Sequence, residues 1–487
     1  MGLRTADEYL ASMDDGREVY YDGERVSDIV GHPVLGQSAR HFARAFTLQH
    51  DPRYRDLATV EYDGERVSRF FAPPRSGEEL RELGALVEAF SLEAQGADFH
   101  LVKFTAANAL LALLLVGKRI DRELGTPYGE RAEALLADFR RDDRTGALCM
   151  SDTKGDRTKK PEEQADPDLY THIVERRPDG IVIRGAKTSV TGAPFVDEQI
   201  VMPTKNMTEA QADYAVACVV PTNAPGVKII ASHGVQPPTS TFDSPLGARY
   251  LALHPTVFFD DVFVPNERVL LAGEAQYAIQ GVMLNGAFLR LNATASGPAK
   301  ADMLVGAAQI IAEMNGLERV ALIRDKIAEL MIHAETMRAF GSAAIQQFEM
   351  VEGVAVPNNL IANTGKYHAT SGYHRAVEIL QDIAGGGLIT SPSAADLNSP
   401  LTGPLVEKYF VGAREVSAAE RLLVFNLIRD LTASDHAGDE AIATLHGGGS
   451  MAAQKQAVLR SYDLPRATEI ARRAAGLEGE RAADGEG

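Results

Sequence analysis

Cysteine and tryptophan are the scarcest residues in this chain of 487 residues, which has two cysteines and no tryptophan. Two thiols can close at most one disulfide and cannot supply a cysteine-rich metal centre. The sequence therefore excludes a disulfide framework and a cysteine-rich zinc or iron–sulfur site. We expect Cys149 to be a small, buried residue.

Basic residues are also in deficit, with 49 lysines and arginines against 67 acidic residues and a net charge of -18. A field of this sign disfavours nucleic acid and anionic membranes as general partners. One local basic pocket can still override the global field, so an anionic small ligand remains compatible with the sequence.

Long apolar segments are missing as well. The longest run, AANALLALLLVG at residues 106–117, is too short to span a bilayer and predicts a buried core helix. The first residues, MGLRTADEYL, lack the apolar core of a secretory leader. We therefore expect a cytoplasmic protein that does not bind membranes.

Several catalytic and nucleotide-binding motifs do not occur. No G-x-G-x-x-G follows a predicted strand, and the P-loop, H-E-x-x-H and G-x-S-x-G motifs are missing. Rossmann and P-loop folds are disfavoured accordingly. The twelve histidines are scattered without metal-ligand spacing, so no metal site is predicted.

The patterns that are present divide the chain into three zones, within a length that allows roughly two to four domains. Residues 1–145 are predicted to be mostly helical. Two local signals stand out there. Asp22-Gly23 lies between two β-prone runs and predicts a hairpin, and Ser76 precedes acidic residues as a helix start does.

The second and third zones differ in period. Residues 146–275 contain short alternating runs with Pro and Gly between them, including a turn at Pro178-Asp179-Gly180, and predict an antiparallel sheet or barrel. Residues 276–475 contain long amphipathic helices, one of them ending at Asn315-Gly316, and predict a bundle. Residues 476–487 are predicted to be a flexible tail.

Three stretches have two possible roles. The charged stretch GALCMSDTKGDRTKKPEEQADPDLY, residues 146–170, reads either as a solvated loop or as a ligand-binding loop at a domain junction. The triple glycines at 385–387 and 447–449 suit helix caps, or close approach of the backbone to a ligand. His446-Gly-Gly-Gly-Ser450 would also suit an anion at a helix N-terminus.

Six of these motifs, in order, resemble one family. MSDTKGDRTKKPEEQADPDLYTHIVERRPDGIVIRGAK, TGA, IVMPT, FDDVFVPNERV, DIAGG and HGGGS are similar to the 4-hydroxyphenylacetate 3-hydroxylase / 4-hydroxybutyryl-CoA dehydratase family. The resemblance covers nearly the whole chain. It implies an α+β fold like that of acyl-CoA dehydrogenases, with an α-helical N-terminal domain, a central antiparallel β barrel and a C-terminal four-helix bundle. It also implies a homotetramer.

The resemblance further implies an FAD site between the β zone and the bundle. Thr191 would lie near flavin N5, and the glycine clusters would approach the cofactor, for which a neighbouring subunit could supply them. The implied FAD-binding residues are Met150, Ser151, Asp152, Lys154, Gly155, Asp156, Arg157, Thr191, Gly192, Gly385, Gly386, Gly448, Gly449 and Ser450.

Neither branch of the family matches in its substrate residues. The dehydratases hold a [4Fe-4S] cluster with three Cys and one His, and those positions fall on Ala97, Leu101, Leu289 and Ser296 here. A dehydratase glutamate is replaced by Ala443. The hydroxylases place an Arg, a Tyr and a His where this chain has Val102, Ala106 and Arg140. An iron–sulfur cluster is therefore not expected, and simple 4-hydroxyphenylacetate is disfavoured as the substrate.

The leading hypothesis is a two-component monooxygenase that takes reduced FAD from a separate flavin reductase and hydroxylates an aromatic or other small organic substrate. Thr191 and Arg290 are the candidate catalytic residues, and Lys103 and Asn292 are candidate substrate contacts. The alternative is a redox-neutral FAD-dependent lyase or isomerase that acts on an acyl thioester without a cluster. A non-enzymatic relative that has lost FAD binding is the third hypothesis.

Overall fold

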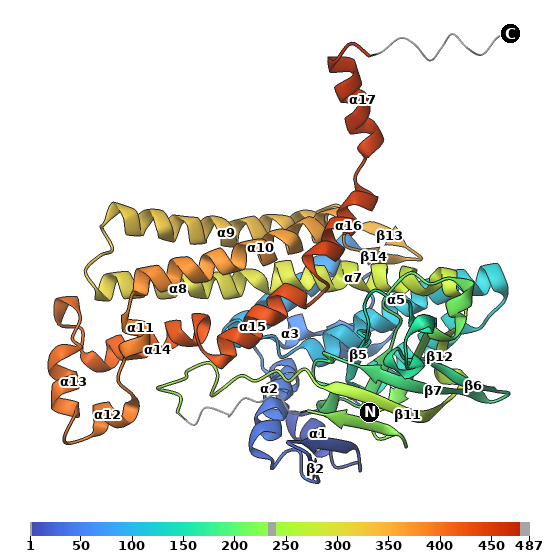
Figure 1. The fold of residues 1–487 in the computed structure, drawn as a ribbon, viewed down its shortest axis with the longest axis horizontal. Helices are drawn as coiled ribbons and strands as arrows, with labels where there is room; N and C mark the ends of the chain where they lie inside the picture. Colours follow the sequence, from blue (N-terminus) through green and yellow to red (C-terminus); the bar gives the residue numbers. More distant parts are fainter. Residues whose placement is uncertain (1, 232–239, 478–487) are drawn as a thin grey trace.

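The computed structural model describes residues 2–231 and 240–477. Its N-terminal part is mostly helical and carries two short hairpins (Figure 1). The helices are α1 (Ala6–Ala11), α2 (Pro33–His50), α3 (Arg55–Ala58), α4 (Gly77–Glu93), α5 (Leu101–Leu124) and α6 (Tyr128–Asp142). The hairpins are β1 (Glu18–Tyr21) with β2 (Glu24–Val26), and β3 (Thr59–Tyr62) with β4 (Glu65–Ser68).

The two local signals of this part are confirmed. Ser76 caps α4, because its side chain accepts a hydrogen bond from the backbone N–H of Glu79 at 3.2 Å. Asp22 and Gly23 form the β1–β2 turn with φ of 50° and 84°, the left-handed region that this type of turn requires.

The apolar run at residues 106–117 lies in α5, as predicted. This helix is the one among the described residues that is long and apolar enough to cross a membrane, and 83% of its most apolar window is buried inside the protein. Phe104 and Leu110 are each at most 1% exposed. The prediction of a core helix is therefore confirmed.

The central part consists of two sheets. The six-stranded sheet has the order β2-β1-β10-β11-β7-β6, and the four-stranded sheet has the order β12-β9-β8-β5. The additional strands are β5 (Gly146–Cys149), β6 (His172–Arg177), β7 (Gly180–Lys187), β8 (Glu198–Val201), β9 (Val216–Pro221), β10 (Val227–Ile230), β11 (Thr256–Pro265) and β12 (Val269–Ala272).

The strand positions and the turn between β6 and β7 are as predicted, but the antiparallel barrel is wrong in two respects. The described strands do not close into a barrel, because β2, β6, β12 and β5 remain edges. In addition, β1 pairs with β10 and β5 pairs with β8 in parallel. The hairpin of the N-terminal zone thus completes a sheet of the second zone, a long-range pairing that local patterns do not reveal.

Helices dominate the rest of the chain. They are α7 (Ala278–Ala295), α8 (Gly297–Met314), α9 (Ala321–Gln346), α10 (Asn359–Ala384), α11 (Gly387–Thr390), α12 (Ala394–Asn398), α13 (Gly403–Tyr409), α14 (Ala418–Thr432), α15 (Asp435–His446), α16 (Met451–Ser461) and α17 (Leu464–Ala474). One small hairpin, β13 (Glu349–Val351) with β14 (Val354–Val356), interrupts them.

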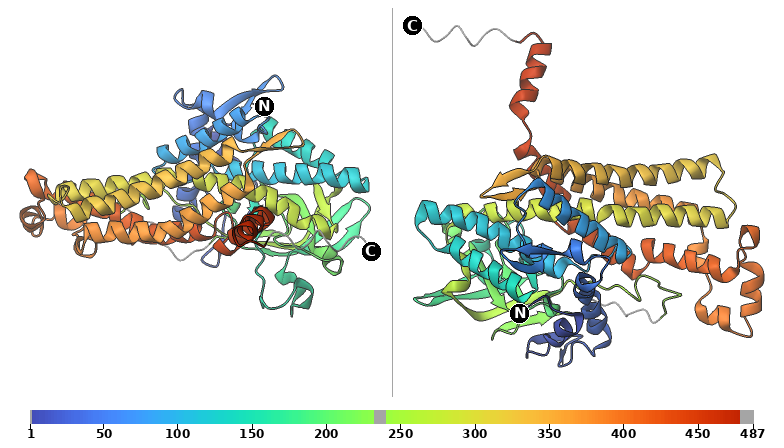
Figure 2. Two further views of the ribbon diagram at one scale, coloured as in Figure 1. Left: turned by 90° about the horizontal axis from the view of Figure 1, so that it is seen from above. Right: turned by 180° about the vertical axis from the view of Figure 1, so that it is seen from behind.

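Helices α8, α9, α10 and α14 pack around a shared apolar core that includes Ile311, Leu330, Leu380 and Ile428 (Figures 1 and 2). Helix α8 ends at Met314, next to the predicted stop at Asn315-Gly316, where Gly316 has a φ of 71°. The zone boundaries remain predictions, and residues 478–487 of the predicted tail lie outside the described residues.

Helix α15 lies between the bundle and the sheets (Figure 1). It forms one wall of a pocket at this junction. The loop at residues 240–254 contributes another wall of this pocket. Buried Asp430 of α14 holds this loop by accepting hydrogen bonds from the backbone N–H groups of Leu246 and Gly247 at 2.8 and 3.0 Å. The Ser244 hydroxyl also donates to Asp430, at 2.7 Å.

Candidate functional site

The loop at residues 150–157 follows β5 and is anchored by one buried ion pair. Lys187 and Asp152 lie 2.7 Å apart, and their side chains are 2% and 3% exposed. Lys187 also donates to the carbonyls of Met150 and Met202, and Asp152 accepts from the Thr171 N–H. Asp152 therefore orders the loop from beneath and has little capacity left for a ligand.

The tip of the loop presents positive charge. Lys154 and Gly155 adopt left-handed backbone conformations with φ of 71° and 48°. A side chain at Gly155 would be crowded, because its first carbon would lie 2.5 Å from Leu169 Cδ1. Burial, and then Arg157, lower the pKa of the Lys154 amine. Lys154 and Arg157 form no ion pair with another described residue and suit an anionic group such as a phosphate.

Thr191 connects this loop to a pocket. The Ser151 carbonyl accepts a hydrogen bond from the Thr188 N–H at 2.7 Å, which places residues 188–192 directly beside the loop. The Gly192 N–H then donates to the Leu253 carbonyl at 3.0 Å. This pairing brings Thr191 Oγ1 to 2.8 Å from His254 Nδ1, and His254 lines the pocket.

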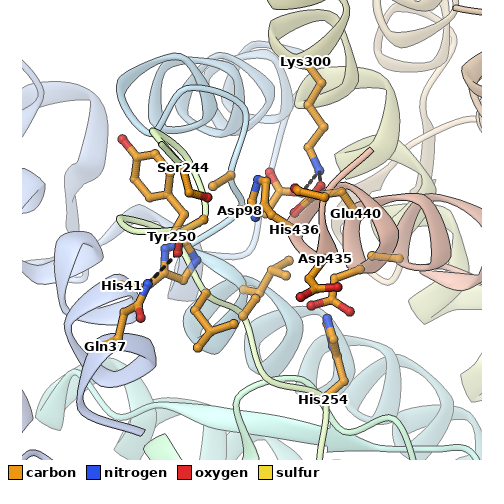
Figure 3. Close-up of a pocket in the computed structure, with 18 residues that line it drawn as sticks. Gln37, His41, Asp98, Ser244, Tyr250, His254, Lys300, Asp435, His436 and Glu440 are labelled. Atoms are coloured by element: carbon orange, nitrogen blue, oxygen red, sulfur yellow. Dashed lines mark hydrogen bonds and ion pairs between the residues drawn. The ribbon is translucent and has the colours of Figure 1, made fainter. Parts of the chain in front are cut away.

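The pocket lies where five segments meet, between the sheets and the bundle (Figure 3). It holds about 920 Å³ of free space, its open mouth included. Helix α2, the segment before α5, the 244–254 loop, α8 and α15 form its walls. Apolar side chains such as Leu101, Leu251 and Ala252 mix there with several ionisable groups. A concave site of this kind at a junction is the usual form of a small-molecule site.

One wall carries a charged triad. Lys300 of α8 lies 2.7 Å from Glu440 of α15 and 3.6 Å from Asp98 (Figure 3). Burial acts to raise the pKa of Asp98, but Lys300 and the Ser91 hydroxyl hold it below its ordinary value. The two carboxylates raise the pKa of Lys300 in turn, against the effect of burial. Asp98 and Lys300 are therefore both charged at neutral pH.

His41 of α2 lies in the opposite wall. It is 1% exposed, and neither ring nitrogen has a hydrogen-bond partner in the described structure. Burial lowers its pKa to about 3, so the imidazole is neutral near pH 7. A neutral imidazole offers one donor and one acceptor.

Arg290 of α7 is a second buried group without a partner. It is 8% exposed and forms no hydrogen bond or ion pair with any residue that the structure describes, and burial lowers its pKa to about 10. A side chain at Gly449 would meet it, since its first carbon would lie 3.5 Å from Arg290 Nη2. The turn at Gly448 and Gly449, both at positive φ, therefore leaves room beside an uncompensated guanidinium. Ser450 caps α16 through the N–H of Ala453.

Two predicted substrate contacts lie elsewhere. Lys103 is 1% exposed and forms a buried ion pair with Asp143 at 2.6 Å, so it does not reach the pocket. Asn292 is bound to His100 at 2.8 Å and does not line the pocket either. Neither side chain is therefore placed to contact a ligand in this pocket. Both side chains are instead bound to residues of the protein itself, Lys103 to Asp143 and Asn292 to His100.

Gly385 and Gly386 are also far from the 150–157 loop within one chain. They follow α10 at the end of the bundle that lies away from the sheets (Figure 1). Gly387 packs against Phe425, where a side chain would clash at 2.5 Å. A role at the same cofactor would need a second subunit, and it remains a prediction.

Sequence reasoning missed most of the pocket. Asp98, Lys300, Glu440, His41 and His254 lie far apart in the chain, and none belongs to a recognisable motif. One signal was available. Asp435 and Asp439 are four residues apart on a predicted helix just before HGGGS, so they share a helix face.

Known proteins match nearly the whole chain. Residues 5–271 match the model for the N-terminal part of 4-hydroxyphenylacetate 3-hydroxylase, and residues 280–476 match the model for its C-terminal part. The chain is 30% identical to 4-hydroxybutyryl-CoA dehydratase/vinylacetyl-CoA-Delta-isomerase of Clostridium aminobutyricum, over 98% of this chain and all of that protein.

Two oxygenase components have a similar sequence identity to this chain. The 4-hydroxyphenylacetate 3-monooxygenase oxygenase component of Thermus thermophilus is 31% identical, over 88% of this chain and 89% of its own. A crystal structure of such an oxygenase component complexed with FAD has a TM-score of 0.89 at 28% identity, covering 98% of each chain. The chain thus belongs to the 4-hydroxyphenylacetate 3-hydroxylase family.

Proposed function

We propose that this protein is the oxygenase component of a two-component monooxygenase, which uses reduced FAD to hydroxylate an aromatic or other small organic substrate. The carrying observation is the continuous path from the basic loop through Thr191 and His254 into the pocket. Several relatives named as oxygenase components, and a neighbouring structure complexed with FAD, support the proposal.

The residues present fit FAD. Lys154 and Arg157 would neutralise its phosphates. Thr191 would hold a hydrogen bond to the flavin edge, and His254 would orient that hydroxyl. When bound, reduced FAD supplies the two electrons that reduce one atom of O₂ to water while the other enters the substrate as a hydroxyl group.

The protein's own contribution is to bind, orient and exclude water. The pocket walls from α2, α8 and α15 enclose the substrate, and the 244–254 loop covers it. Arg290, next to Gly449, would stabilise negative charge near the bundle end of the site. A flavin reductase would be the partner, and a homotetramer and a cytoplasmic location remain part of the proposal.

The pocket argues against cluster chemistry. Ala97 and Leu101, at two of the positions where a dehydratase would have cluster ligands, line the pocket with apolar groups, as does Ala443. Cys149 and Cys218 are both fully buried in the four-stranded sheet and do not line it. The described residues contain no group of three His, Cys, Asp or Glu side chains arranged to hold a metal ion.

A redox-neutral lyase or isomerase acting on an acyl thioester is the second candidate. The match to the clostridial dehydratase/isomerase, which spans that entire protein, favours it. Such an enzyme would use bound FAD without O₂ and without a reductase.

One pair of assays separates the two. Purified protein is supplied with FAD, a flavin reductase and NADH, and substrate-dependent hydroxylated product is measured in air and under argon. The monooxygenase requires O₂ for product. Conversion of a hydroxyacyl-CoA under argon, without NADH, would instead establish the lyase. Failure to bind FAD would contradict both.

A further inference from the structure

Arg290 of α7 and Lys366 of α10 are buried cations that form no ion pair with a described carboxylate. Arg290 is 8% exposed and donates no hydrogen bond to a described residue. Lys366 is 2% exposed and donates to one neutral group, the Thr444 carbonyl of α15. Buried charges are normally paired, because their removal from water costs free energy that a counter-ion offsets. Two unpaired buried cations therefore point to an anion that binds beside them.

The two cations lie close enough to act on one another. Burial lowers the pKa of Lys366, and the neighbouring cations Lys300 and Arg290 lower it further, to about 8. Asp98 offsets this only in part, and it already lies beside Lys300. Burial lowers the pKa of Arg290 to about 10. Both groups are therefore mostly charged near pH 7, and an anion near both would be attracted by two charges.

The glycine turn after α15 lies against the guanidinium. A first side-chain carbon at Gly449 would lie 3.5 Å from Arg290 Nη2, so the bare turn leaves space beside that nitrogen. The guanidinium itself occupies the space that a side chain at Gly286 would take. Gly448 and Gly449 have φ of 72° and 98°, a conformation that disfavours larger residues. Helix α16 begins directly after the turn, and its N-terminus adds partial positive charge.

Helix α15 connects this turn to the pocket. Ala443 lines the pocket, and Gly447 follows four residues later, which is about 6 Å along a helix. Gly447 is exposed, so the turn is open to solvent. A ligand of modest length can therefore place its body in the pocket and a charged end at the turn.

We propose that Arg290 and Lys366 bind the carboxylate of a small organic acid at the Gly448–Gly449 turn, while the uncharged part of the acid lies in the pocket. The substrate class is thus an organic carboxylate, which rests on the proposed function for its turnover. The planar guanidinium of an arginine matches a carboxylate with two parallel hydrogen bonds, and the lysine adds a point charge. The FAD phosphates would belong to the separate loop with Lys154 and Arg157.

Binding to the FAD-loaded protein tests this directly. Phenylacetate and phenylacetamide have nearly the same size and shape, but only the first carries a charge. Their dissociation constants are measured by calorimetry with oxidised FAD bound and no reductase. We expect phenylacetate to bind at least about tenfold more tightly than the amide.

Matched variants locate the selectivity. Arg290→Gln and Lys366→Met should each weaken phenylacetate about tenfold and leave phenylacetamide nearly unchanged. Arg460→Gln and Lys455→Met remove exposed cations from α16 and are the controls, so they should change neither ligand. The affinity of FAD is measured in the same variants and should not change.

Two further readouts separate a ligand site from a structural role. Arg290→Met should not lower the melting temperature of the ligand-free protein, because it removes a charge that no described carboxylate neutralises. Phenylacetate should bind more weakly as the pH rises above 8, since Lys366 then loses its proton. Lys366→Met should remove this decline. Lys300, Arg290 and Asp98 are the charged groups that act on Lys366.

Three results would overturn the proposal. The first is equal binding of phenylacetate and phenylacetamide, and the second is equal loss of phenylacetate binding in the control variants. The third is weaker FAD binding in Arg290→Gln with phenylacetate unchanged, which would assign the site to the phosphates of the cofactor. Selective phenylacetate binding by a protein without O₂-dependent hydroxylation would support the carboxylate site and refute the monooxygenase. O₂-dependent hydroxylation without preference for acids would do the reverse.

Discussion

The 150–157 loop and the pocket behind His254 are built from opposite charges. The loop presents Lys154 and Arg157 around a buried ion pair, whereas the pocket gathers four carboxylates around one lysine. Both belong to a chain of net charge -18. The overall charge therefore says little about either site. Four experiments test this contrast and the groups on which it depends.

The ion pair beneath the loop should give the largest effect. Asp152→Asn leaves Lys187 charged and buried without its partner, so the free energy of unfolding should fall by about 3–5 kcal/mol. Urea denaturation followed by circular dichroism measures the change. Asp156→Asn, at the exposed side of the same loop, is the control and should alter stability little. Equal effects of the two substitutions would contradict the anchoring role of Asp152.

The basic tip of the loop should affect cofactor binding alone. Removing both cations in Lys154→Ala/Arg157→Ala should weaken FAD about tenfold to a hundredfold, because two charge-assisted contacts are lost. Flavin fluorescence quenching measures the dissociation constant. Lys160→Ala, further along the loop, should leave it unchanged. If FAD binding survives the double substitution, the phosphates lie elsewhere, and Arg290 beside Gly449 becomes the next candidate.

The pocket should make stability depend on pH through His41. Its pKa falls from 6.5 in the unfolded chain to about 3 in the folded protein, so the unfolded state binds the extra proton. His41 therefore contributes stability above pH 6.5 that is lost as the pH falls towards 3, by about 1.4 kcal/mol per pH unit within this window.

The variant His41→Phe should flatten the loss of stability between pH 6 and 4, with His41→Gln as a second, polar replacement. The slope should decrease without vanishing, because burial also lowers the pKa of His333 to about 4. The groups near His41 that also act on it are Arg44, Asp98, His100 and His436. An unchanged slope in both variants would show that His41 titrates normally.

Iron removal should have the smallest effect, namely none. A strong iron chelator should leave the melting temperature and the turnover of the FAD-loaded protein unchanged, because Ala97 and Leu101 offer no ligands and both cysteines are buried in a sheet. Metal analysis should find no stoichiometric iron. Activity that disappears with chelation and returns with iron and sulfide would identify a cluster enzyme.

Local signals predicted local structure well. The turn at Asp22-Gly23, the cap at Ser76 and the buried helix around Leu110 depend on neighbouring residues, and all three are present. The barrel was wrong because sheet closure depends on pairings such as β1 with β10, more than 200 residues apart, which no local pattern records. The family resemblance implied the same barrel, but it also identified the family, which periodicity could not do.

The pocket escaped prediction for the same reason. Lys300 and Glu440 are 140 residues apart, and only the crossing of α15 brings them together. Lys103 illustrates the converse, since it was a candidate substrate contact but is neutralised by Asp143. Sequence position alone does not reveal whether a buried charge serves a partner within the fold or one outside it.

Asp430 connects the helical bundle to the pocket. It fixes Leu246 and Gly247 through its carboxylate, and its backbone carbonyl accepts a hydrogen bond from Ser434, the cap of α15. Two opposite walls of the pocket are therefore tied to one residue of α14. A shift of α14 would move both walls together, so the pocket keeps its shape only while the bundle keeps its own. The shape of the pocket and the packing of the bundle are therefore coupled through α14.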